Sequence, residues 1–134
     1  MTDKLDNQSR ADLIEYRFEK SRQTLKEADV LAAAGMYNAS VNRLYYAAYY
    51  AASALMIGNS IETVTHKGIK TMLGLKFIHA GLLENEYGRI YQSLFDGRQA
   101  GDYEDFIYYD IDNYKELRPL AEKFIDRISV LVKK

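Results

Sequence analysis

The chain has 134 residues, and its 18 Lys and Arg residues nearly balance its 19 Asp and Glu residues, which leaves a net charge of −1. This length predicts one domain that spans residues 1–134. The charge balance excludes a chain-wide attraction to nucleic acid or to an anionic membrane, so any such contact must be local. The sequence contains no cysteine, which excludes a disulfide framework, a thiolate metal site and a cysteine nucleophile.

The N-terminal residues are polar and carry mixed charges. Residues 1–9 are therefore expected to form a flexible segment, and they lack the apolar run of a secretory signal. The longest low-charge stretch, residues 37–57, contains Arg43 and predicts a buried helix rather than a membrane span. We expect a cytoplasmic protein with no membrane contact.

Apolar residues recur at steps of three and four along most of the chain, which is the spacing of amphipathic helices. The alternation of β-branched residues that is typical of strands is absent. The pattern predicts an all-α bundle of about five helices. The first three span residues 10–34, 38–57 and 66–79, the fourth includes Tyr87 and ends near Gly101, and the fifth spans residues 112–132.

Single residues in this pattern predict helix ends and irregularities. Gly35 is expected to end the first helix, and Thr65 is expected to cap the third through its hydroxyl group. Pro119 is expected to kink or restart the fifth helix. The second helix is apolar on two faces, which predicts that it lies at the centre of the bundle.

Arg43 is the only formal charge in residues 37–57, and a lone charge inside an apolar helix needs a partner. One interpretation pairs it with a carboxylate from another helix, while its guanidinium lies over a tyrosine ring. The other interpretation places Arg43 in a nucleotide- or RNA-binding site, where its guanidinium contacts a phosphate group. Two tyrosines of the same helix, Tyr46 and Tyr50, would contribute to this site.

Residues 98–106 join the fourth and fifth predicted helices and combine an arginine, a glycine and several acids. Arg98 could stabilise a pentavalent phosphate while a neighbour moves a proton, which is the division of labour needed to cleave RNA through its 2′-hydroxyl group. Asp102 or Tyr103 could be that neighbour only if its pKa were strongly shifted. In the structural alternative, Arg98 stabilises the end of its helix and Asp102 forms a local turn bond.

The third predicted helix carries a local basic patch, in which Lys67 and Lys70 are candidate nucleotide or RNA contacts. A solvated helix face is the alternative. The segment from Asp102 to Glu116 is acidic and could bind a basic protein surface. The spacings of the acids and of the two histidines match no calcium or zinc motif, so no metal site or cofactor is predicted.

Three segments in order carry a family resemblance: Asn42-Arg43-Leu44-Tyr45-Tyr46-Ala47, then Thr65-His66-Lys67-Gly68, then Arg98 through Asp102-Tyr103-Glu104-Asp105-Phe106. With this combination the chain resembles the HEPN domain superfamily, in its small stand-alone branch, over nearly its whole length. The resemblance implies an up-and-down antiparallel bundle that forms a homodimer. It also implies a partner, a minimal nucleotidyltransferase, with which the protein forms a toxin–antitoxin pair.

Many HEPN toxins are metal-independent ribonucleases, and their signature is an arginine followed a few residues later by a histidine. Arg98 aligns with that arginine, but Tyr103 stands where the histidine would be, and no histidine follows. In some family toxins the partner adenylylates a tyrosine just beyond the histidine, and the matching position here is Asp105.

Three hypotheses follow from these residues. The favoured one is a homodimeric HEPN-like binding protein that pairs with a nucleotidyltransferase-like protein and holds nucleotide or RNA near Arg43 and Arg98. The second is a divergent metal-independent endoribonuclease that uses Arg98 with Asp102 or Tyr103. The third is a purely structural helical adaptor.

Overall fold

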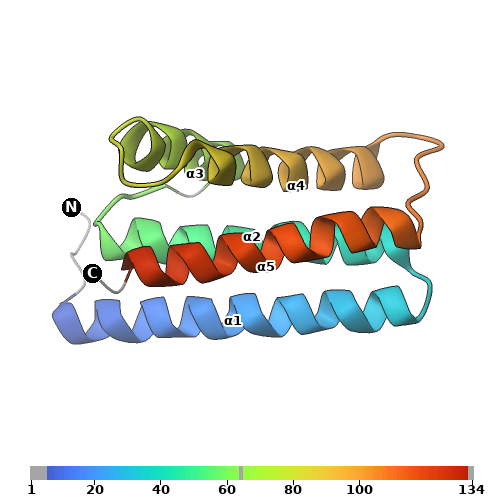
Figure 1. The fold of residues 1–134 in the computed structure, drawn as a ribbon. Helices are drawn as coiled ribbons and strands as arrows, with labels where there is room; N and C mark the ends of the chain where they lie inside the picture. The colour runs from blue at the N-terminus through green and yellow to red at the C-terminus, as the bar shows by residue number, and fades with distance from the viewer. Residues whose placement is uncertain (1–5, 64, 133–134) are drawn as a thin grey trace.

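The computed structural model describes residues 6–63 and 65–132, and within them the chain is helical without a strand. The elements are α1 (Asn7–Ala33), α2 (Tyr37–Gly58), α3 (His66–Met72), the π-helix η1 (Leu73–Ile78), α4 (Asn85–Tyr103) and α5 (Ile111–Val132). The four long helices, α1, α2, α4 and α5, alternate in direction along the bundle (Figure 1). The prediction of an all-α, up-and-down bundle of about five helices is therefore confirmed.

Helix α2 lies at the centre, because it packs against α1, α4 and α5. Small side chains let these neighbours approach closely, and Ala47, Ala48 and Ala51 are fully buried. Ser21 of α1 donates a hydrogen bond of 2.7 Å to the main-chain oxygen of Ala47, which satisfies the polar group of a fully buried serine. The predicted central position of the second helix is confirmed.

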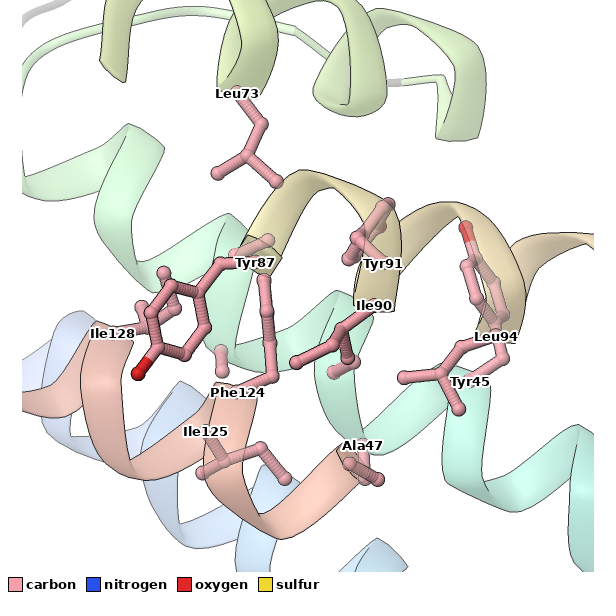
Figure 2. Close-up of a cluster of buried hydrophobic side chains, with 14 of the residues drawn as sticks. Tyr45, Ala47, Leu73, Tyr87, Ile90, Tyr91, Leu94, Phe124, Ile125 and Ile128 are labelled. Carbon is pink, nitrogen blue, oxygen red and sulfur yellow. The ribbon is translucent and has the colours of Figure 1, made fainter. Parts of the chain in front are cut away.

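The core between α2, α4 and α5 is rich in aromatic rings (Figure 2). Tyr45 of α2, Tyr91 of α4 and Phe124 of α5 are all buried. Leu73 of η1 also reaches this core, so the short third segment is anchored to the bundle. Burial of each such large side chain contributes roughly 1.5–3 kcal/mol before the cost of ordering it.

The N-terminus of α1 differs from the prediction. The helix begins at Asn7, because the carboxylate of Asp6 accepts a hydrogen bond of 2.7 Å from the main-chain nitrogen of Ser9. Residues 7–9 are therefore helical, and residues 1–5 of the predicted flexible segment lie outside the described residues. Gly35, with a φ of 79°, follows the end of α1 as predicted.

The third helical segment changes its form partway along. Thr65 caps α3 as predicted, with its hydroxyl oxygen 2.8 Å from the main-chain nitrogen of Gly68. The predicted α-helix to His79 becomes a π-helix at Leu73, and the main-chain nitrogen of His79 donates to the oxygen of Gly74 at 2.8 Å. This i to i+5 bond marks the wider turn of a π-helix.

Helix α5 continues through Pro119, so the helix does not restart there. Proline removes one main-chain hydrogen bond, but Pro119 is exposed, and water can solvate the carbonyl group that loses its partner. No helix within residues 6–63 and 65–132 combines the length and the apolar character needed to cross a membrane.

Candidate functional site

Arg98 lies on the side of α4 that faces α2, and its side chain is only 11% exposed. Its Nη2 donates hydrogen bonds to the hydroxyl oxygens of Tyr46, at 3.3 Å, and Tyr103, at 3.2 Å. The guanidinium carbon also lies 5.5 Å from the centre of the Tyr46 ring, within cation–π distance. A nearly buried positive charge is thus surrounded largely by tyrosines.

Asp102 is the carboxylate beside Arg98, one turn further along α4. Its Oδ2 accepts a hydrogen bond of 2.8 Å from Asn42 of α2 and lies 3.4 Å from Nε of Arg98. The second contact is an ion pair without hydrogen-bond geometry, so the buried Nε of Arg98 has no acceptor among the described residues. A buried N–H group without an acceptor favours the binding of a ligand that supplies an acceptor oxygen.

Arg43 brings a second guanidinium to the same tyrosine. Its Cζ lies 4.9 Å from the centre of the Tyr46 ring, and its Nε and Nη2 donate to Oδ1 of Asn42 at 3.1 and 2.8 Å. Its Nη1 lies 3.7 Å from the carboxylate of Glu27 on α1, so the expected carboxylate partner is present. We call the following residues the Arg98 cluster: Asn42, Arg43, Tyr46, Arg98, Asp102 and Tyr103.

The segment after α4 is tied to α2 by Asn38. The side-chain amide nitrogen of Asn38 donates to the main-chain oxygens of Gly101, at 3.2 Å, and Ile107, at 2.8 Å. Its amide oxygen accepts from the main-chain nitrogen of Tyr109 at 2.8 Å, and the Tyr109 hydroxyl donates to the oxygen of Gly97 at 2.8 Å. These bonds fix the last turn of α4, which carries the carboxylate of the cluster.

His66, the first residue of α3, lies beside the cluster. Its ring centre is 5.4 Å from that of Tyr46 and 4.4 Å from that of Tyr49, and its Nδ1 is 2.9 Å from the hydroxyl oxygen of Tyr45. Burial and the positive charge of Arg98 lower the pKa of His66. The structure therefore places an imidazole with a lowered pKa next to the Arg98 cluster.

The other predicted binding residues lie outside the Arg98 cluster. The Nζ of Lys70 lies 4.4 Å from the centre of the Phe95 ring, and Lys67 is exposed. Tyr50 lies one helical turn beyond Tyr46, with the Nζ of Lys20 at 4.9 Å from its ring centre. The structure thus joins Arg43, Tyr46, Arg98, Asp102 and Tyr103 in one cluster and leaves the lysines and Tyr50 at its periphery.

Sequence reasoning missed the contributions of Asn42 and His66. Asn42 was visible only as part of a sequence pattern, although its spacing of four from Tyr46 puts both on one helix face. His66 was visible only as a member of the basic patch. Its position beside Arg98 depends on the packing of α3 against α2, which no local spacing reveals. Within the described residues, no group of three His, Asp or Glu side chains could hold a metal ion.

Taken together, these features define the class as an all-helical bundle with an arginine- and tyrosine-rich cluster between its central helix and α4. The model of the HEPN domain matches residues 14–131 of the chain. The chain therefore belongs to the HEPN family.

Named relatives agree with this assignment. A "UPF0332 protein" of Thermotoga maritima is 31% identical over 120 residues, which cover 90% of this chain and 91% of that protein. The "Putative toxin MJ0605" of Methanocaldococcus jannaschii is 31% identical over 123 residues, which cover 90% of this chain and 89% of that protein. A "UPF0332 protein" of Archaeoglobus fulgidus is 26% identical over 125 residues, which cover 92% of this chain and 98% of that protein. The chain is thus similar over most of its length to two proteins named UPF0332 and to one named as a putative toxin.

Proposed function

We propose that this HEPN protein is the toxin-type component of a two-protein system and that it binds RNA through a phosphate group held at Arg98. The observation that carries the proposal is the buried guanidinium of Arg98, whose Nε has no hydrogen-bond acceptor among the described residues. A phosphate oxygen is a suitable acceptor for such a group. The toxin name of a relative supports the proposed class of function.

The side chains over Arg98 would let an RNA strand reach it. Tyr103 is 68% exposed, and Gln99, whose Oε1 accepts from Nη1 of Arg98 at 3.2 Å, is exposed as well. If these two side chains turn outward, they uncover one edge of the guanidinium. Tyr103 can then stack on a base, and Arg43 adds a second positive charge beside the phosphate.

RNA binding is tested by fluorescence anisotropy with a labelled single-stranded RNA in the presence of a chelator. Arg98→Ala is expected to weaken binding at least tenfold, because charge-assisted hydrogen bonds of about 1.5–3 kcal/mol are lost. Arg89→Ala is the matched control, since Arg89 is an exposed arginine of the same helix. Equal affinities of the wild type and Arg98→Ala would reject the site. An absence of RNA and nucleotide binding by the wild type would favour the structural adaptor.

The proposal includes assembly into a homodimer and pairing with a nucleotidyltransferase-like protein in the cytoplasm. The segment after α4 supports a partner surface, because Phe106 and Tyr108 are 88% and 83% exposed. Acidic side chains adjoin them in the sequence, which favours a basic partner surface. Light scattering of the purified chain tests the dimer. Co-purification with the product of the neighbouring gene tests the pairing, and Phe106→Ser should reduce it.

A second candidate is a divergent metal-independent endoribonuclease. Arg98 would stabilise the charge of the transition state, as in the binding hypothesis, but a proton-transfer group is also required. Asp102 and Tyr103 both contact Arg98, at 3.4 and 3.2 Å. The observation that favours this candidate is the nearby imidazole of His66.

A further inference from the structure

We propose that His66 is the proton-transfer residue of a ribonuclease reaction at the Arg98 cluster, so that α3 supplies in space the imidazole that is missing after Arg98 in the sequence. This inference rests on the proposed RNA binding and goes beyond it, because it names the group that moves the proton in the ribonuclease candidate.

The geometry joins the two groups through shared rings. The ring centre of His66 lies 5.7 Å from that of Tyr45 and 5.4 Å from that of Tyr46. The guanidinium carbon of Arg98 lies 5.6 Å and 5.5 Å from the same two ring centres. An imidazole and a guanidinium that are far apart in the sequence therefore border one pair of tyrosines.

The orientation of the imidazole is fixed by α2. Its Nδ1 lies 2.9 Å from the hydroxyl oxygen of Tyr45, which is fully buried, and its ring packs 4.4 Å from that of Tyr49. Its Nε2 makes no hydrogen bond to the described part of the chain. In the tautomer in which Nδ1 donates to the hydroxyl oxygen of Tyr45, Nε2 is unprotonated and can accept the proton of a substrate hydroxyl group, as a proton-transfer histidine requires.

The charges around His66 suit a base. The titratable and charged groups that face it are Tyr45, Tyr46 and Tyr49 from α2 and Arg98 from α4. Burial raises the pKa of Tyr45 to about 12 and also raises the pKa of Tyr49, so both stay neutral at physiological pH. Since the pKa of His66 is lowered, its imidazole is neutral there and can accept a proton.

The reaction consistent with these groups is transesterification of RNA. The Nε2 of His66 takes the proton of a ribose 2′-hydroxyl group, and the 2′ oxygen forms a bond to the adjacent phosphorus. The bond from phosphorus to the 5′ oxygen breaks, and the 5′ oxygen takes a proton from water. The products are a 2′,3′-cyclic phosphate and a 5′-hydroxyl group, and the histidinium returns its proton to solvent. Arg98 stabilises the negative charge that develops on the phosphate oxygens.

The two residues first considered for this role are less suitable. The carboxylate of Asp102 is engaged by Asn42 at 2.8 Å and by Arg98 at 3.4 Å. The hydroxyl oxygen of Tyr103 accepts a hydrogen bond from Arg98, and a phenol is a weak base. His66 has an ordinary pKa close enough to neutrality to act without a large shift.

The experiment compares wild type, His66→Gln and His79→Gln prepared in parallel. Cleavage of a labelled RNA is followed in a chelator, the product ends are identified, and RNA affinity is measured on the same samples. His79 is the matched control, because it is the other histidine of the chain and is exposed. His66→Gln is expected to lose about 100-fold or more in cleavage rate while RNA affinity changes less than about threefold.

The outcomes separate the two proposals. Wild-type RNA binding without cleavage overturns the role of His66 and leaves RNA binding intact, whereas failure of both binding and cleavage overturns both proposals. Cleavage by His66→Gln at the wild-type rate also overturns the role of His66.

A second variant covers the case in which His66→Gln does not fold. The wild-type cleavage rate should rise with pH through a midpoint below the ordinary histidine value of about 6.5. Tyr45→Phe removes the partner of Nδ1 and should move this midpoint. A rate that is independent of pH, or an unmoved midpoint in Tyr45→Phe, contradicts the proposal.

Discussion

Gly101 lies in the last turn of α4, where the structure leaves little space for a side chain. A Cβ atom at this position would lie 2.8 Å from Cε2 of Tyr109, whose ring is held by the hydrogen bond of its hydroxyl group to Gly97. Gly101→Ala is therefore expected to lower the free energy of unfolding by about 1–3 kcal/mol through overpacking. Urea denaturation monitored by circular dichroism measures this loss.

Gly74→Ala is the matched control for that substitution. A Cβ atom at Gly74 would meet nothing within 4 Å, and alanine is favoured over glycine in a helix by about 0.5–1 kcal/mol. Gly74→Ala should thus leave the stability unchanged or raise it. If both variants lose the same free energy of unfolding, contact with Tyr109 is not the reason why a side chain at position 101 is destabilising.

Individual site residues were predictable from the sequence to different degrees. The lone charge of Arg43 indicated both a carboxylate partner and a tyrosine ring, and the structure shows Glu27 and Tyr46 in these positions. Arg98 continues the three- and four-residue spacing of the buried residues Tyr91 and Leu94 of α4, and its own side chain is 11% exposed. The position of His66 was not predictable, because it depends on how α3 packs against the bundle.

The start of α3 is capped by the side chain of Thr65. The hydroxyl group of Thr65 accepts a hydrogen bond of 2.8 Å from Gly68. Thr65→Ala should lower the free energy of unfolding by about 1 kcal/mol, because a first-turn N–H group loses its partner. Thr71→Ala, at an exposed position within α3, is the control and should be neutral or stabilising. Similar losses for both variants would contradict the capping role.

Helix α5 contains the clearest opportunity to raise stability. Pro119 lies inside the helix and is exposed, so its replacement restores a main-chain donor without disturbing the core. Pro119→Ala is expected to raise the midpoint of thermal unfolding, by an amount equivalent to about 1–3 kcal/mol. A lower midpoint would indicate that the ring of Pro119 makes a packing contribution larger than the cost to the helix.

The helices themselves were largely predictable, because their apolar spacing is strong and their ends carry glycine, aspartate or threonine. One error lies where tertiary contacts decide the outcome, and another lies at a local helix cap. The change from α3 to η1 at Leu73 was not predictable, since the buried residues Leu73 and Phe77 also fit the spacing of an α-helix. The early start of α1 was missed because Asp6 was not considered as its cap.

For the bundle as a whole, an ion pair between the first and last helices predicts how stability depends on pH. Asp29 of α1 accepts from Nε and Nη2 of Arg118 on α5, at 2.9 and 3.1 Å, and from the hydroxyl group of Tyr114. The hydrogen bonds from Arg118 hold the pKa of Asp29 below its ordinary value. The pair therefore stabilises the fold above the unfolded-state pKa of about 3.9, and this contribution is lost as the pH falls through the folded-state pKa.

Denaturation at a series of pH values tests this dependence. Asp29→Asn should be less stable than the wild type at neutral pH and should lose less stability on acidification below about pH 4. Asp126→Asn serves as a control, because Asp126 forms an exposed pair with Arg22 and should contribute little. Parallel acid profiles for the wild type and Asp29→Asn would contradict the assignment.

The overall architecture followed from the sequence because local helix patterns and short connections leave few ways to pack such a bundle. The cluster at Arg98 was only partly predictable, since it is assembled from α2 and α4, with α3 adding His66. The dimer and the partner protein remain predictions, because they depend on surfaces of other chains.

The most direct test of the site uses the two histidines of the chain, His66 and His79, in an NMR titration of their imidazole signals. Single-stranded RNA is added in the presence of a chelator. If RNA phosphate binds at the Arg98 cluster, the His66 signals should shift and its pKa should rise, because a nearby anion favours the charged imidazole, while the signals of the exposed His79 should stay in place. Saturating RNA that leaves the His66 signals unmoved, or that moves only those of His79, would contradict binding at this site.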